Sequence, residues 1–309
     1  MTLSYLVMGG IFMSKHVLVT GANGQLGSEL RGLSGYFPGD DFVFIDQEVL
    51  DLSDSAAILA WFENKDFDVI INCAAYTAVD KAETEVGLAT AINTTAVRTL
   101  AQIAKQKVIS LLHISTDYVF AGDSCVPYQE TDVTSPQGVY GQSKLDGEQA
   151  MLAINPDRSV IIRTSWLYSR FGNNFVKTMI RLGKERKELN VIYDQVGTPT
   201  CAKDLALVLL MIIQSPQLEA QQGTEVFHYS NEGVCSWYDF ALAIFELAPI
   251  KCKVNPIETK DYPTPAKRPH YSLLNKAKIK NTFQLSIPYW RDSLPECLEH
   301  IKYLKGDDL

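Results

Sequence analysis

Residues 16 to 30, HVLVTGANGQLGSEL, join a short apolar strand to a helix through a loop that holds three glycines. Gly21 permits a tight turn, Gly24 lets the backbone approach a pyrophosphate, and Gly27 lets the helix lie close to the strand. A structural turn would use the same glycines. Placed between a strand and a helix, the GxxGxxG spacing predicts a dinucleotide site at the helix N-terminus.

The rest of the first half repeats this strand and helix rhythm, which is typical of a parallel sheet covered on both faces. We expect strands near 16–20, 42–46, 68–75, 108–116 and 159–168, and helices near 55–62 and 86–105. The predicted fold class is α/β, a Rossmann-type doubly wound parallel sheet with a smaller, mixed α/β C-terminal substrate domain.

We expect an N-terminal extension over 1–12 and a dinucleotide-binding domain over 13–166. Residues 167–309 are expected to form mainly the substrate domain, with the segments 190–200 and 224–230 returning to the sheet.

Composition narrows the functional classes. A net charge of -8 and a pI near 5.2 argue against a nucleic-acid surface. Apolar runs such as 205–213 are too short to cross a membrane. The six cysteines form no CxxC pair and the five histidines no HExxH pattern, so we expect reduced thiols, no transition-metal site and a cytoplasmic protein.

Asp46 closes the second expected strand, where a carboxylate can accept hydrogen bonds from the adenosine ribose. That placement favours NAD and repels a 2′-phosphate, although a solvated aspartate at a strand end would look the same. Asp51 and Leu52 could line the adenine pocket.

Tyr140 and Lys144 lie four residues apart at the start of an expected helix, so their side chains share a face. A lysine ammonium favours phenolate, so we expect Lys144 to lower the pKa of Tyr140 from about 10 and make it a proton donor. An exposed helix pair has the same spacing.

The segment HISTDYVF, 113–120, ends a strand where ligands bind in parallel sheets. The Thr116 hydroxyl can hydrogen-bond a substrate carbonyl, and Asp117 and Tyr118 could contact sugar hydroxyls. Alone, they would be ordinary polar residues at a strand end.

Together with NCAAYTAVDKAE (72–83) and VYGQSKLDGE (139–148), these motifs resemble the extended short-chain dehydrogenase/reductase family. The likeness runs from about Ser14 over nearly the whole chain and includes RTSWLY (163–168), VGTPTCAKDLA (196–206) and AKRPHYSLL (266–274). Within the family it is strongest to the nucleotide-sugar reductases that complete dTDP-L-rhamnose synthesis.

The resemblance implies reduction of the C4 ketone of dTDP-4-dehydro-L-rhamnose, with NADPH or NADH as the reductant. It also implies a possible homodimer, and a product that is used to build bacterial cell-surface glycan. It implies a catalytic set of Thr116, Tyr140 and Lys144. The implied cofactor contacts are Gly21, Asn23, Gly24, Gln25, Leu26, Asp46, Asp51, Leu52, Ala74, Ala75, Tyr76, Tyr140 and Lys144, with Thr77 beside them. The implied substrate contacts are Thr116, Asp117, Tyr118, Trp166 and Arg268, with 79–81 facing the sugar.

Three points stay open. Trp166 alone would be taken for a core aromatic at a domain junction. Gln47 stands where a basic residue is common in the family, which argues against a strong NADPH preference, and no bridging metal is assigned, although Glu29 follows the glycine loop. The alternatives are reduction or epimerisation of another nucleotide sugar, or a non-catalytic role like that of the regulatory subunit of methionine adenosyltransferase.

Overall fold

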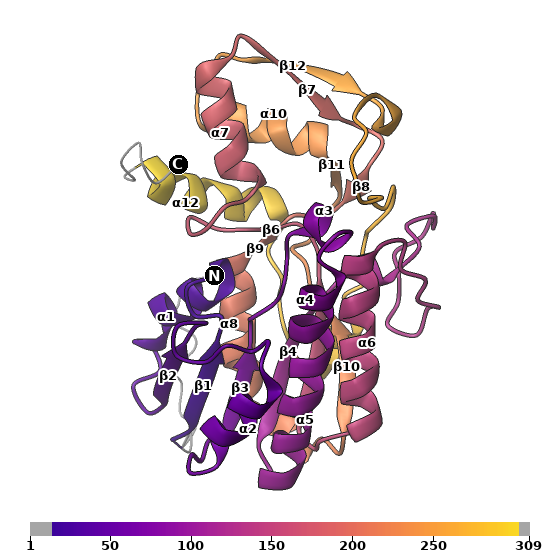
Figure 1. Ribbon diagram of the computed structural model, residues 1–309. Helices are drawn as coiled ribbons and strands as arrows, with labels where there is room; N and C mark the ends of the chain where they lie inside the picture. Colours follow the sequence, from indigo (N-terminus) through magenta and orange to yellow (C-terminus); the bar gives the residue numbers. More distant parts are fainter. Residues whose placement is uncertain (1–13, 303–309) are drawn as a thin grey trace.

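A six-stranded parallel sheet forms the centre of the protein in a computed structural model that describes residues 14–302 (Figure 1). The strand order is β10-β5-β4-β3-β1-β2. The strands are β1 (His16–Thr20), β2 (Asp41–Ile45), β3 (Val69–Asn72), β4 (Ser110–Thr116), β5 (Ser159–Thr164) and β10 (Thr224–His228). This order confirms the predicted Rossmann-type sheet. The expected extension over 1–12 lies outside the described residues.

Helices cover both faces of this sheet, because successive strand side chains point to opposite faces and both are apolar. Val17 and Val19 belong to one core, and Leu18 to the other. The first core includes α1 (Gln25–Ser34), α8 (Ala202–Ile213) and α11 (Ala277–Phe283), and the second includes α2 (Ser55–Phe62), α5 (Ala96–Lys107) and the last two turns of α6 (Val139–Ile154).

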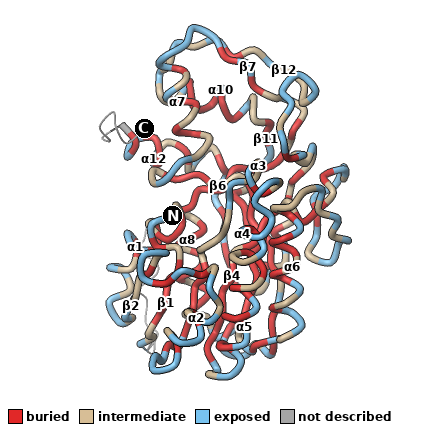
Figure 2. The backbone as a smooth tube through the Cα atoms, in the orientation of Figure 1, coloured by how far each residue is buried: buried red, intermediate tan, exposed pale blue. Residues whose placement is uncertain are grey.

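A separate core lies beyond the carboxyl ends of the sheet strands (Figures 1 and 2). It is smaller than the two cores of the sheet taken together and is called the smaller core below. It is built by α7 (Phe175–Glu185), α10 (Trp237–Leu247) and α12 (Trp290–Lys302), together with β7 (Glu188–Ile192) and β12 (Lys253–Ile257), which pair in parallel. Short ladders join β6 (Leu167–Tyr168) to β9 (Thr200–Cys201), and β8 (Val196–Gly197) to β11 (Cys235–Ser236).

Of the two segments expected to return to the sheet, one does so. Residues 224–228 form β10, which pairs with β5, so this prediction is confirmed. The prediction for 190–200 is wrong, because β7 pairs with β12 and β8 with β11. The side chains of β7 alternate between exposed and buried, which suits a strand with one solvated face and not one covered on both faces.

The helix expected over 86–105 is interrupted. It consists of α4 (Val86–Thr90), a π-helical turn over Ala91–Thr95, and α5. Shorter elements complete the chain: α3 (Val79–Ala82), a 3-10 turn at Asp117–Val119, α9 (Pro216–Ala220) and a 3-10 turn at Thr259–Asp261. Among the helices of residues 14–302, none combines the length and the apolar character needed to cross a membrane.

Candidate active site

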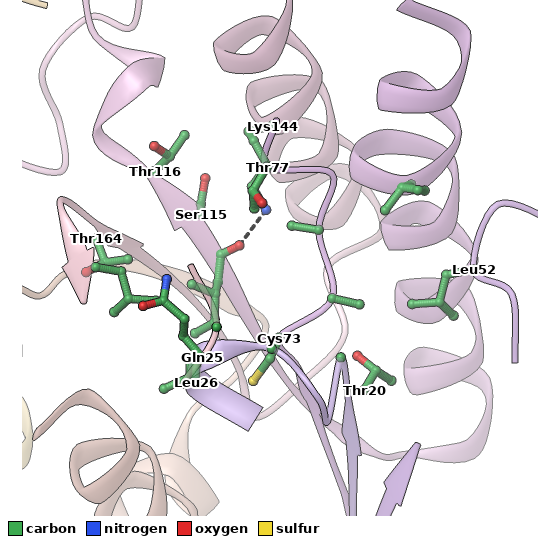
Figure 3. Close-up of a pocket in the computed structure, with 18 of the residues that line it drawn as sticks. Thr20, Gln25, Leu26, Leu52, Cys73, Thr77, Ser115, Thr116, Lys144 and Thr164 are labelled. Carbon is green, nitrogen blue, oxygen red and sulfur yellow. Dashed lines mark hydrogen bonds between the residues drawn. The ribbon is translucent and has the colours of Figure 1, made fainter. Parts of the chain in front are cut away.

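A cavity of about 600 Å³ opens at the carboxyl ends of the central strands (Figure 3). This volume suits a small organic ligand or cofactor. Its wall is formed by Thr20, Gly21, Gly24, Gln25, Leu26, Ile45, Asp46, Gln47, Leu50, Asp51, Leu52, Cys73, Ala74, Ala75, Thr77, Val79, Ile92, Ile114, Ser115, Thr116, Asp117, Tyr118, Tyr140, Lys144, Thr164, Ser165, Trp166, Leu167, Gly172 and Asn173.

The glycine loop forms one end of the cavity and has the tight geometry that the sequence predicted. Gly21 has a φ of +65°, and a Cβ there would lie 2.6 Å from the backbone nitrogen of Ala74. A Cβ on Gly27 would lie 2.3 Å from the Gly21 carbonyl oxygen, so only glycine allows α1 to lie this close to the loop. Gly24 is the N-cap of α1, which directs the helix N-terminus toward the cavity.

Asp46 lies beside this loop and orders it. Its Oδ2 accepts a hydrogen bond from the Asn23 backbone N–H at 2.7 Å, and its Oδ1 accepts one from the Gln47 N–H at 2.7 Å. The carboxylate therefore has a structural contact as well as a place on the cavity wall. Asn23 itself is outside the wall.

Tyr140 and Lys144 reach the cavity from the first two turns of α6. The helix starts where the Val139 N–H donates to Glu83 Oε1 at 2.9 Å. The π-helical turn anchors the next residues, because Asn93 Nδ2 donates to Ser143 Oγ at 3.0 Å and its Oδ1 accepts from the Tyr76 N–H at 2.9 Å. π-turns often mark functional positions, and this one ties α6 to the loop after β3.

The pKa of Tyr140 differs from the expectation. Burial raises it to about 12, hydrogen bonding with Thr116 lowers it in part, and the charge of Asp117 raises it. The prediction that Lys144 lowers this pKa below its ordinary value is wrong here, because desolvation outweighs the favourable contacts. Tyr140 therefore carries its proton at neutral pH.

Lys144 is one of the largest fully buried side chains. Its Nζ donates to the Ile114 carbonyl at 2.6 Å, the contact drawn in Figure 3, and lies 3.4 Å from His113 Nε2. Burial lowers the pKa of Lys144 to about 8, while Glu148 and Cys73 act in the opposite direction. The ammonium is thus less stable than on the protein surface and titrates near physiological pH.

Thr116, Asp117 and Tyr118 line the cavity where β4 ends. Thr116 Oγ1 donates to Asp117 Oδ1 at 3.1 Å and accepts from the Tyr118 N–H at 3.2 Å. Burial raises the pKa of Asp117 to about 7, and the hydrogen bond from Thr116 partly offsets this. Within the described chain, Asp117 Oδ2 is buried without a hydrogen-bond partner. The Tyr118 and Tyr140 rings meet edge to face, with centroids 5.4 Å apart.

Five predicted site residues are not on the cavity wall within residues 14–302. Besides Asn23, these are Tyr76, Asp80, Lys81 and Arg268. The Tyr76 hydroxyl donates to Glu85 Oε2 at 2.6 Å. Arg268 forms two hydrogen bonds to Asp80, at 2.8 and 2.7 Å, which attach the loop around 268 to α3. The other predicted contacts are brought together.

Sequence reasoning missed part of the wall. Ser115, Thr164 and Ser165 stand at the carboxyl ends of β4 and β5, so the rule that ligands bind there could have found them. Gly172 and Asn173 come from an irregular loop after β6, and no motif in the sequence marks them.

Glu29 is buried in α1 and accepts a hydrogen bond from Ser169 Oγ at 2.6 Å. Burial raises its pKa, and Ser169 and Arg170 offset this. Across residues 14–302, no group of three or more His, Cys, Asp or Glu side chains is placed to hold a metal ion.

Comparison with known proteins identifies the family. A family model described as "RmlD substrate binding domain" matches residues 15–303. The dTDP-4-dehydrorhamnose reductase of Aggregatibacter actinomycetemcomitans is 41% identical over 284 residues, covering 90% of this chain and 96% of that protein. The Escherichia coli K12 reductase is 39% identical over 297 residues, covering 93% and 98%.

Solved structures agree. A dTDP-4-dehydrorhamnose reductase from Clostridium acetobutylicum superposes with a TM-score of 0.87 at 43% identity, covering 93% of this chain and 99% of that one. The Bacillus anthracis enzyme, solved in complex with NADP, has a TM-score of 0.86 at 38% identity, with the same coverage. The chain therefore belongs to the RmlD family of dTDP-4-dehydrorhamnose reductases.

Proposed function

We propose that the protein reduces the C4 ketone of dTDP-4-dehydro-L-rhamnose to give dTDP-L-rhamnose, with NADPH or NADH as the reductant. The observation that carries the proposal is the position of Tyr140, Lys144 and Thr116 on the wall of the cavity that the glycine loop closes. The relatives above are named for this reaction, and the match extends over nearly the whole chain.

Tyr140 is assigned as the proton donor. Its raised pKa keeps the phenol protonated at neutral pH, so it can protonate the alkoxide that forms at C4. The Thr116 hydroxyl is assigned to hydrogen-bond the same oxygen, because both side chains line one wall and hydrogen bonding between them already lowers the pKa of Tyr140.

The residues at the loop end fit a dinucleotide. The positive φ of Gly21 and the N-cap position of Gly24 leave backbone N–H groups free of Cβ obstruction where a pyrophosphate would lie. Asp46 is assigned to the adenosine ribose, and Lys144 to the nicotinamide ribose. A nicotinamide cofactor bound here supplies the hydride.

The sugar end is assigned to Asp117, Tyr118 and Trp166. The buried Asp117 Oδ2, which has no partner in the described chain, can accept a hydrogen bond from a sugar hydroxyl. We assign sugar recognition to the smaller core, with a domain boundary near 166. We also propose a homodimer, a cytoplasmic location and a role for Arg268 in substrate binding. Light scattering tests the homodimer.

The test is nicotinamide absorbance after mixing the protein with NADH or NADPH and dTDP-4-dehydro-L-rhamnose. Cofactor oxidation matched by dTDP-L-rhamnose formation supports the proposal, and the two rates measure cofactor preference. If folded, cofactor-binding protein oxidises neither cofactor, this substrate is wrong. Other keto sugars, and pull-down of an adenosyltransferase, then test the alternatives.

A further inference from the structure

A row of three buried polar residues crosses the apolar central sheet beneath the cavity. The parallel register places Thr20 of β1 beside Asn72 of β3, and Asn72 beside His113 of β4. Their exposed fractions are 1%, 2% and 0%. Burying such groups is unfavourable unless they pair with one another. Here Thr20 Oγ1 donates to Asn72 Oδ1 at 2.7 Å, and Asn72 Nδ2 lies 3.0 Å from His113 Nδ1.

Both ends of this row reach the cavity. At one end His113 Nε2 lies 3.4 Å from Lys144 Nζ. At the other end Thr20 is itself on the cavity wall, and Figure 3 labels both Thr20 and Lys144. Asn72 and His113 lie between them, outside the wall. The row therefore connects the proposed catalytic lysine to Thr20, which lies on the cavity wall directly before the glycine loop.

The imidazole of His113 is neutral, because burial and the neighbouring Lys144 hold its pKa well below the usual range. A neutral imidazole has one donor and one acceptor nitrogen. When the Asn72 amide turns its oxygen toward Nδ1–H, Nε2 is an acceptor, and both an ammonium and a neutral amine have an N–H to donate to it. The Thr20 hydroxyl can donate to the amide oxygen or accept from the amide nitrogen, so it pairs with either orientation of Asn72. The row can therefore satisfy both charge states of Lys144 without a proton moving between the ring nitrogens.

We propose that His113, held by Asn72 and Thr20, is a positioning residue that acts through Lys144 and lets the lysine pass a proton to Tyr140 in each turnover. This inference rests on the proposed reductase function. The phenol O–H of Tyr140 breaks as its proton moves to the alkoxide. The phenolate then takes a proton from the Lys144 ammonium. The neutral amine keeps an N–H donated to His113 Nε2 until a proton from solvent restores the ammonium.

Other ionisable groups also face Lys144. Glu148, one turn further along α6, and Cys73, just after β3, favour the ammonium. Glu148 is itself neutralised by Arg163 of β5 at 2.6 Å, and Tyr140 shares the face of α6. None of these groups is altered by a change at His113 or Asn72, so a change in the titration of Lys144 in His113→Phe reports on the row. In Asn72→Asp the charge of the new carboxylate contributes as well.

Two variants should move this titration in opposite directions. His113→Phe replaces the polar partner by an apolar ring, so the pKa of Lys144 should fall. Asn72→Asp places a carboxylate on Nδ1–H, which leaves Nε2 as an acceptor for the ammonium, so the pKa should rise by about one unit or more. The measurement is NMR of lysine labelled with ¹³C at Cε, with the Lys144 signal identified by its loss in Lys144→Met.

Turnover gives a second readout. The alkaline limb of the kcat profile should move to lower pH in His113→Phe and to higher pH in Asn72→Asp, while KM changes little. His113→Gln, which restores a polar group at the Nε2 position, should bring the limb back toward wild type. If His113→Phe does not fold, as judged by circular dichroism, Asn72→Asp and His113→Gln carry the test.

The matched control is His228→Phe. His228 is equally buried, but its ring faces the Tyr128 carbonyl at 3.1 Å and Arg163 at 3.5 Å. It should lose stability without moving the Lys144 titration. Equal Lys144 titrations in wild type and both row variants, or the same shift in the control, would overturn the proposal. The NMR titration needs no substrate, so an inactive wild type would reject the proposed reaction separately.

Discussion

The indole rings of Trp166 and Trp237 are stacked in parallel, with centroids 3.6 Å apart and an interplanar angle of 12°. Trp166 follows β5 and lines the cavity, whereas Trp237 begins α10 in the smaller core. Trp166 has a φ of +49°, a left-handed conformation that is unfavourable for a bulky residue and persists only where its surroundings hold it. The stack is such a constraint, so the smaller core determines where this part of the cavity wall lies.

Replacing the supporting ring should therefore weaken sugar binding. In Trp237→Leu we expect KM for the dTDP-sugar to rise by up to about tenfold, the loss that one aromatic pair accounts for, with a smaller change in kcat. Trp61→Leu is the control, since Trp61 stacks on Phe67 in a different region. An unchanged KM would show that Trp237 does not orient Trp166 for substrate.

Tyr140→Phe deletes the phenol and keeps the ring. Turnover should fall by about 10²-fold or more, because general acid catalysis is lost, while cofactor binding measured by fluorescence titration survives. Tyr168→Phe is the matched control. That tyrosine is buried in the smaller core, and its hydroxyl has no partner in residues 14–302. Equal loss of turnover in both variants would rule out the assigned role.

Lys144→Met removes the buried ammonium and its bond to the Ile114 carbonyl. We expect the Kd for NADH or NADPH to rise by about tenfold and turnover to fall, since a charged donor to the ribose is lost. Lys276→Met controls for removing a buried lysine, because Lys276 pairs with Glu232 away from the cavity. A normal cofactor titration in Lys144→Met would contradict the ribose contact.

Asp46→Asn keeps an oxygen that can accept from the glycine loop but removes the charge that repels a 2′-phosphate. The ratio of kcat/KM with NADPH to that with NADH should rise by about tenfold. Asp41→Asn, at the opposite end of β2, should leave the ratio unchanged. If the ratio of kcat/KM with NADPH to that with NADH stays constant in Asp46→Asn, the carboxylate does not contact the adenosine ribose.

Asp117 should make stability depend on pH. Burial raises its folded pKa to about 7, well above its ordinary value of about 3.9. Between these values the folded state binds the proton and the unfolded state does not. Stability should therefore fall as pH rises from about 4 to 7, by about 1.4 kcal/mol per pH unit from this group.

Asp117→Asn removes this dependence. The variant should gain stability relative to wild type as pH increases from 5 to 8, measured by urea denaturation in the absence of ligand. A stability difference that is constant over this range would mean that Asp117 does not bind a proton in the folded protein.

The main sheet and the two ends of the cavity could be predicted from sequence because their signals are local. An apolar run followed by GANGQLG specifies a strand, a tight turn and a helix start through the conformations of a few neighbouring residues. The spacing of Tyr140 and Lys144 likewise fixes a shared helix face. The prediction that 190–200 joins the main sheet was wrong because a strand in that sheet is buried on both faces, whereas β7 has one exposed face.

The sequence alone therefore determined the order of strands and helices, the glycine loop and the helix that carries Tyr140 and Lys144. Only the tertiary structure decided the charge states and the partners across strands. The pKa of Tyr140 rises because α6 is buried against the sheet, Arg268 pairs with Asp80, and Thr20, Asn72 and His113 meet through the parallel register. These depend on desolvation and on distances between segments far apart in the chain, which no local pattern encodes.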